Sequence, residues 1–194
     1  MSKKRILILI SGRGSNMKAI AENVDHGILQ NLCEIVTVFS NKSDAPGIAL
    51  ACEKGIPVQV ISSRGKTKTE YNRKLLDFLR SMQPDLIVLA GYMRILPVEI
   101  VRAFPDRIIN IHPADTRKHR GLHGYAWAWE KGLNTTKITV HFVDEGLDSG
   151  RIIAQKDVDL TGAQDIIEVE KRGLAVEHVF YSECLRNLLL SIRS

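Results

Sequence analysis

The chain has 194 residues, of which 44% are hydrophobic and 25% are charged, and its formal net charge is +5. This length and composition predict one globular domain that buries a core without disulfides or a structural metal. Its three cysteines are widely spaced, which argues against a disulfide framework or a zinc site and favours a reducing compartment, the cytoplasm. The apolar run behind the basic first residues is too short for a signal peptide or a membrane span.

The positive charge allows two classes of partner, nucleic acid or small anions such as phosphates and carboxylates. The basic residues are scattered, with no long basic run and no interleaved aromatic side chains. This distribution is not typical of a nucleic-acid surface. We therefore expect small-molecule substrates, with no nucleic-acid or membrane partner.

Short apolar segments alternate with helical patterns along the first part of the chain. Unbroken apolar, β-branched runs predict strands at residues 5–10, 34–39, 57–61, 85–89 and 107–111. Apolar residues at helical spacing predict helices between these strands, at residues 16–29, 45–54 and 69–82. Gly55 and Pro84 are expected to end the last two helices. Strands that alternate with helices indicate a parallel sheet covered by helices on both faces.

The pattern changes after residue 135. Two strands are predicted at residues 137–143 and 151–158, joined by a turn rich in Gly and Asp. A long C-terminal helix follows, with an apolar stripe formed by Leu174, His178, Tyr181, Leu185, Leu188 and Ile192. The predicted fold class is therefore α/β, a mostly parallel Rossmann-like open sheet with an antiparallel strand pair and a long C-terminal helix.

A glycine-rich loop, Ser-Gly-Arg-Gly-Ser-Asn at residues 11–16, connects the first strand to the first helix. Gly12 and Gly14 leave room for a ligand close to the backbone, and Ser15 and Asn16 suit a helix N-terminus. The free amides and the dipole of that terminus favour an anion. The spacing matches neither the dinucleotide fingerprint nor the nucleotide P-loop, so a single phosphate fits better. The alternative is a tight turn that binds no ligand.

Polar side chains gather near the end of the fifth predicted strand. Asn110 and His112 are two residues apart, so both point to the same face of the sheet. They either satisfy each other or belong to a functional site, because unpaired buried polar groups are costly. Asp148 is either a turn residue or a carboxylate that orients His112 and keeps it protonated. His141 is a candidate core histidine or a supporting group.

At these residues the sequence resembles the folate-dependent glycinamide ribonucleotide formyltransferase family. The similarity keeps its order over most of the chain, through segments 11–16, 39–42, 89–96, 110–113, 121–123, 140–143 and Asp148. The resemblance implies transfer of a formyl group from the co-substrate 10-formyltetrahydrofolate to the amine of glycinamide ribonucleotide, in de novo purine biosynthesis and without a metal. It also implies a monomer or a homodimer. We expect one domain over residues 1–194, with a phosphate-binding part at 1–113 and a folate-side part at 114–194.

The resemblance also implies roles for individual residues. The catalytic set would be Asn110, His112 and Asp148. The substrate phosphate and ribose would be bound by Gly14, Ser15, Asn16 and Glu177. The folate would be bound by Met93, Arg94, Ile95, Leu96, Asp144 and Leu147. This chemistry is consistent with the residue types, because amide and imidazolium donors stabilise the oxyanion that forms when an amine attacks a formyl carbon. A water near the carboxylate would carry the proton to the leaving nitrogen.

Three departures from the family pattern concern the substrate more than the reaction. Residues 114–120 carry basic groups where most family members have two apolar anchors and a second proline. Leu174 replaces a glutamine of many relatives, and Ser149 replaces a glycine. Two other functions therefore remain open. One is formyl transfer to another phosphorylated amine, such as an amino-sugar nucleotide, and the other is a non-catalytic folate- and nucleotide-binding protein.

Overall fold

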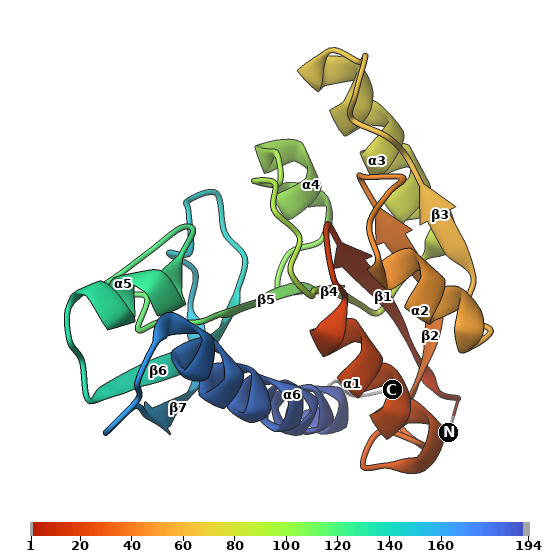
Figure 1. Ribbon diagram of the computed structural model, residues 1–194. Helices are drawn as coiled ribbons and strands as arrows, with labels where there is room; N and C mark the ends of the chain where they lie inside the picture. The colour runs from red at the N-terminus through yellow and green to blue at the C-terminus, as the bar shows by residue number, and fades with distance from the viewer. Residues whose placement is uncertain (1, 192–194) are drawn as a thin grey trace.

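The computed structural model describes residues 2–191 and confirms the predicted fold class (Figure 1). In this part of the chain one sheet has the strand order β3-β2-β1-β4-β5-β6-β7. Its strands are β1 (Lys4–Ile10), β2 (Cys33–Ser40), β3 (Val58–Val60), β4 (Leu86–Leu89), β5 (Ile108–His112), β6 (Thr135–Phe142) and β7 (Ile152–Asp159). β1 to β5 are parallel, whereas β6 is antiparallel to both β5 and β7. Every strand lies within two residues of its predicted position.

The helices are α1 (Ser15–His26), α2 (Gly47–Glu53), α3 (Lys68–Met82), α4 (Val98–Ala103), α5 (Gly124–Glu130) and α6 (Ile166–Ser191). α4 and α5 were not predicted, because six and seven residues are too few to show a helical period. The predicted end of the first helix at residue 29 is wrong, since α1 ends before Gly27. α3 begins with a capping box between Thr67 and Glu70.

Two apolar layers cover the sheet, one on each face. Ile6, Ile8 and Ile10 of β1 point toward α1 and α6, whereas Leu7 and Leu9 point toward α3 and α4. This alternation follows from the two-residue period of a strand. Figure 1 shows α1 and α6 together on one side of the sheet, with α3 and α4 on the other.

The buried face of α6 differs from the predicted apolar stripe. Tyr181 and Leu185 are buried as predicted, but Leu174, His178 and Leu188 are only partly buried, and Ile192 lies outside the described residues. The buried face instead includes Gly173 and Glu177. Neither a glycine nor a carboxylate contributes to an apolar pattern, so the pattern alone misplaced the face.

The sheet has a topological switch point between β1 and β4. α1, which follows β1, covers one face, while α3, which precedes β4, covers the other. Ligands of open α/β sheets bind at such points, beyond the carboxyl ends of the strands. Here the two loops are tied together, because Ser11 donates its backbone N–H to the Gly91 carbonyl at 3.1 Å and its Oγ accepts from Met93 N at 2.8 Å.

Candidate active site

The glycine-rich loop after β1 is held against the start of α2. Gly14 has a φ of +75°, and a Cβ placed on it would lie 2.8 Å from Cα of Gly47. The backbone N–H of Gly47 donates to the Gly12 carbonyl at 3.0 Å. Gly14 therefore has two reasons to be glycine, its left-handed backbone and a close backbone contact. The amides at the start of α1 remain directed to the carboxyl edge of the sheet, where an anion would bind.

A buried polar cluster lies behind this loop. Asn16 is 8% exposed, and its Nδ2 donates to Oε2 of Glu177 while Tyr125 Oη donates to Oε1. Burial is the main influence on Glu177 and raises the pKa of its carboxyl, although these two hydrogen bonds act in the opposite direction. Oδ1 of Asn16 is buried and has no hydrogen-bond partner among residues 2–191. A buried acceptor of this kind is free to accept a hydrogen bond from a ligand or a water molecule.

Tyr125 was not singled out from the sequence. Its ring packs so closely on α6 that a Cβ at Gly173 would lie 2.1 Å from Cε1 of Tyr125. Glycine is unfavourable in the interior of a helix. A glycine in the middle of a long predicted helix was therefore a signal that another group approaches the helix there. The close approach brings the phenol to Glu177.

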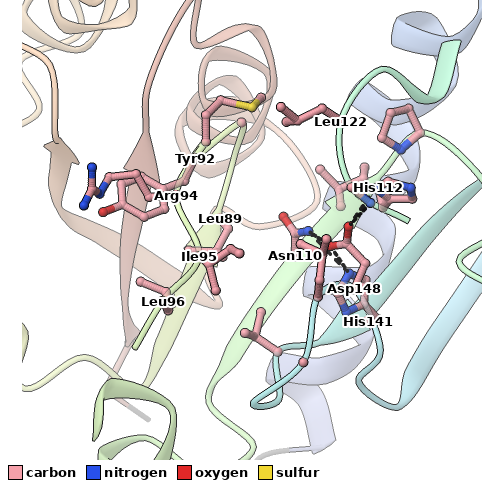
Figure 2. A pocket seen from close by; sticks show the side chains of 18 of the residues that line it. Leu89, Tyr92, Arg94, Ile95, Leu96, Asn110, His112, Leu122, His141 and Asp148 are labelled. Carbon is pink, nitrogen blue, oxygen red and sulfur yellow. Dashed lines mark hydrogen bonds and ion pairs between the residues drawn. The ribbon is translucent and has the colours of Figure 1, made fainter. Parts of the chain in front are cut away.

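The carboxylate of Asp148 joins the polar side chains of β5 and β6 (Figure 2). Asn110 Nδ2 donates to its Oδ1 at 3.2 Å. Nδ1 of His112 lies 3.5 Å from its Oδ2, and Nε2 of His141 lies 3.5 Å from its Oδ1. The sheet register explains the grouping, because Asn110 pairs with His141 and the side chains of paired residues share a face. The structure thus brings together the three residues predicted as catalytic.

The loop that carries Asp148 is tightly folded. Asp144 Oδ1 accepts hydrogen bonds from Gly146 N at 3.0 Å and from Ser149 Oγ at 2.8 Å. A Cβ at Gly150 would lie 1.8 Å from the Phe142 carbonyl oxygen, so the loop returns directly against the end of β6. Asp148 itself adopts a φ of +46°, which is uncommon for a residue other than glycine. Local strain of this kind is typical of functional positions.

The two nitrogens of His112 have different partners. Nε2 lies 3.1 Å from the His119 carbonyl oxygen, and because a carbonyl only accepts, this nitrogen carries a proton. Burial lowers the pKa of His112 below its usual 6.5, and this outweighs the opposite effects of Asp148 and the carbonyl. The imidazole is therefore neutral at neutral pH, with its Nε2 protonated. A negative charge developing nearby favours the uptake of a second proton.

Asp148, in contrast, is ionised. Burial alone raises the pKa of its carboxyl, but hydrogen bonds from His141 and from the Gly121 N–H bring it below the usual 3.8. The Gly121 N–H donates to Oδ2 at 2.8 Å. An ionised carboxylate therefore faces Nδ1 of a neutral imidazole, and it would stabilise the imidazolium formed if Nδ1 takes up a proton.

Asn110 has a defined orientation. Its Nδ2 lies 3.2 Å from Asp148 Oδ1 and 3.3 Å from His141 Nε2. Nδ1 of His141 lies 2.8 Å from the Phe142 carbonyl oxygen. The amide nitrogen of Asn110 is thus directed to Asp148, and its oxygen faces away from Asp148 (Figure 2).

A cavity of about 450 Å³ opens beside this cluster. Its lining includes Asn110, His112 and Asp148, together with all of the predicted folate-binding residues, Met93, Arg94, Ile95, Leu96, Asp144 and Leu147. Met93, Ile95, Leu122 and Leu147 are all exposed, by 47% to 68%. Exposed apolar side chains that gather around one cavity favour a ligand with a large apolar surface.

Some of the predicted binding residues lie away from the cluster of Asn110, His112 and Asp148. Arg94 stacks its guanidinium carbon 4.6 Å above the Tyr71 ring, and Figure 2 shows the side chain directed away from His112. The predicted phosphate and ribose residues do not line the cavity: Gly14, Ser15, Asn16 and Glu177. They lie in the loop after β1 and on α1 and α6, and the Ser11 hydrogen bonds connect that loop to Gly91 and Met93 at the cavity.

No helix between residues 2 and 191 has both the length and the apolar character needed to cross a membrane. The same stretch contains no group of three or more His, Cys, Asp or Glu side chains arranged to hold a metal ion.

The fold and the site define a doubly wound α/β protein with a glycine-rich loop and a cluster of Asn, His and Asp side chains at the carboxyl edge of its sheet. The model of the formyl transferase family matches residues 4–185. The chain therefore belongs to the formyl transferase family, which confirms the family resemblance seen in the sequence motifs.

Known proteins similar to this chain include two named formyltransferases and a trifunctional purine biosynthetic protein. A phosphoribosylglycinamide formyltransferase of Haemophilus influenzae is 38% identical over 92% of this chain and 84% of its own length. A phosphoribosylglycinamide formyltransferase structure from Bacillus halodurans has a TM-score of 0.91, is 33% identical, and is aligned over 98% of this chain and 97% of its own. A trifunctional purine biosynthetic protein of Drosophila pseudoobscura pseudoobscura is 39% identical over 94% of this chain, which spans only 14% of that protein.

Proposed function

We propose that this protein transfers the formyl group of 10-formyltetrahydrofolate to the amine of glycinamide ribonucleotide, a step of de novo purine biosynthesis. The names of its relatives support this substrate pair. The observation that carries the proposal is the meeting of Asn110, His112 and Asp148 at one cavity, with the carboxylate in contact with both partners.

The two substrates would occupy the two parts of the site. The pterin end of the folate lies in the cavity against Met93 to Leu96, with Asp144 and Leu147 on the opposite wall. The substrate phosphate lies on the amides of Gly14, Ser15 and Asn16 at the start of α1. Glu177 and the unpaired Oδ1 of Asn16 are acceptors for the ribose hydroxyls and the amine.

In the proposed reaction the amine nitrogen attacks the formyl carbon, and a C–N bond forms while the carbonyl oxygen becomes an oxyanion. His112 takes up the proton that the amine loses and, as an imidazolium, stabilises this charge, with Asp148 stabilising the imidazolium. Collapse of the intermediate breaks the bond to the folate nitrogen, which receives the proton lost by the amine. The Asn110 amide, oriented by its hydrogen bond to Asp148, supplies a second donor to the oxyanion.

The test is a turnover assay with purified protein, 10-formyltetrahydrofolate and glycinamide ribonucleotide, followed by the folate absorbance. We expect turnover by the wild type and its loss in His112→Ala. The matched control is His26→Ala, since His26 is exposed at the end of α1 and remote from the cavity. Full activity in His112→Ala would overturn the mechanism.

A second candidate, formyl transfer to another phosphorylated amine, is favoured by one feature of the substrate side. Leu174 offers no hydrogen bond where many relatives carry glutamine. Tyr125 in addition donates a hydrogen bond to Oε1 of Glu177. The same assay with a panel of phosphorylated amines, including amino-sugar nucleotides, distinguishes the two. A lower KM for another amine supports the second candidate, and binding without turnover of any amine supports a non-catalytic protein.

A further inference from the structure

The atypical loop at residues 114–120 contains a buried carboxylate. Asp115 is 6% exposed, and its Oδ1 accepts from Arg117 N, Arg117 Nε and Gln155 Nε2, each at 3.1 Å. Its backbone carbonyl accepts from Lys118 N at 2.8 Å and from His119 N at 2.9 Å. Asp115 therefore organises the turn through both its side chain and its backbone, at a place where the family pattern has apolar anchors.

Asp115 is linked through β7 and β6 to the strand that carries His112. In the sheet His112 pairs with Thr139, and Thr139 pairs with Gln155, so the three residues form one row across β5, β6 and β7. Gln155 Nε2 also donates to Thr139 Oγ1 at 2.9 Å, and Gln155 Oε1 accepts from Arg117 Nη2 at 2.7 Å. Thr139 Oγ1 in turn donates to the Ala114 carbonyl at 2.7 Å. The loop is thus fixed to the row by polar contacts.

This loop supplies two backbone contacts to the proposed catalytic pair. The His119 carbonyl lies 3.1 Å from His112 Nε2, and the Gly121 N–H donates to Asp148 Oδ2 at 2.8 Å. The first contact fixes the proton of a neutral His112 on Nε2, and the second directs the carboxylate. The other titratable side chains facing this pair are His119 of the same loop and His141 of β6.

We infer that Asp115 and Gln155 are positioning residues, which pin residues 115–121 so that the loop backbone sets the proton position of His112 and the orientation of Asp148. Neither side chain lines the cavity, so both act through the loop. The catalytic consequence rests on the proposed function, whereas the effect on His112 does not.

The first test replaces Gln155 with Met, which is similar in volume but has no amide to hold Asp115 and Thr139. With the His119 carbonyl displaced, a neutral His112 is expected to move its proton from Nε2 to Nδ1, where it can donate to Asp148. Nitrogen-15 NMR of labelled histidine reports this tautomer, and the His112 signals are assigned by their loss in His112→Asn. The matched control, Gln30→Met, changes an exposed glutamine outside the cavity and is expected to keep the wild-type tautomer.

In the turnover assay we expect kcat of Gln155→Met to fall about tenfold to a hundredfold, since small displacements of catalytic groups have effects of that size. KM for the amine is expected to stay unchanged, because the phosphate loop is not part of the network. Asp115→Asn keeps the volume of the side chain and serves if Gln155→Met fails to fold. It is expected to shift the tautomer in the same direction.

An unchanged His112 tautomer in both folded variants would overturn the inference. So would a wild-type kcat in a variant whose tautomer has moved. The NMR result does not require turnover. A wild type that formylates no amine would overturn the proposed function. A shifted His112 tautomer in Gln155→Met would still support the positioning role of Asp115 and Gln155.

Discussion

Nδ1 of His112 lies 3.5 Å from Oδ2 of Asp148, although one residue ends a buried strand and the other belongs to a loop beyond the next strand. The carboxylate also accepts from Asn110 and from the Gly121 N–H. One ionised group therefore contacts three segments of the chain: β5, the loop at Gly121 and, through His141, β6. Removal of its charge affects all of them at once.

We expect Asp148→Asn to reduce kcat about a hundredfold to a thousandfold, the range seen when one group that stabilises a transition state is removed. KM for both substrates should change little, because Asp148 contacts the reacting end of the site. Steady-state kinetics measure both parameters. Glu145→Gln is the matched control, since it neutralises an exposed carboxylate of the same loop that contacts only Arg102 on α4. A wild-type kcat in Asp148→Asn would contradict the proposed role.

Two histidines with lowered pKa values are expected to make the stability of the protein depend on pH. Burial lowers the pKa of His112 and of His178 below 6.5, so as the pH falls the unfolded chain takes up protons before the folded protein does. The contribution of these two histidines to the free energy of unfolding is therefore largest above pH 6.5 and decreases as the pH falls through their folded-state pKa values. Urea unfolding at a series of pH values measures this slope.

His178→Leu isolates part of that effect. Nε2 of His178 is buried without a hydrogen-bond partner in the described chain, and the charged groups facing the ring are Glu22 and Lys18 of α1. The variant should be more stable than the wild type by about 1 kcal/mol at neutral pH, because an unsatisfied polar group is removed. The difference should grow as the pH falls below 6.5. His26→Leu, at an exposed position, should keep the wild-type slope.

The two glycines of the phosphate loop should respond differently to alanine. In Gly14→Ala the new Cβ lies 2.8 Å from Cα of Gly47, at a φ of +75°. We expect this variant to lose at least about 1 kcal/mol of unfolding free energy and most of its affinity for the phosphorylated substrate. Gly12→Ala adds a Cβ with nothing within 4 Å and should keep its stability. Equal thermal unfolding temperatures for the two variants would contradict the packing argument.

Tyr125→Phe tests the substrate side of the site. The phenol donates to Oε1 of the buried Glu177 and lowers the pKa of that carboxyl. Without it the pKa of Glu177 rises further, so a smaller fraction is ionised and able to accept hydrogen bonds from the amine substrate. We expect a higher KM for that substrate, more so at low pH, with kcat and the KM for folate unchanged. A KM that is unaffected at every pH would exclude this role for Tyr125.

The sequence contained most of the fold because its signals are local. Unbroken apolar runs such as residues 6–10 mark strands buried on both faces, and alternation with helices leaves few arrangements other than a parallel sheet. The shared face of Asn110 and His112 follows from the two-residue strand period. The short helices α4 and α5 lacked such a signal, and the buried face of α6 was misplaced because Gly173 and Glu177 belong to it.

Tertiary contacts decided which of the polar groups meet in the site. The sequence by itself determined which chemical groups end each strand, because strand and turn geometry depend on neighbouring residues. Only the folded chain decided that Tyr125 reaches Glu177, that Arg94 stacks on Tyr71, and that Asp115 joins Gln155. Each of these depends on segments distant in sequence, whose spacing and orientation are set by the packing of the whole sheet and its helices.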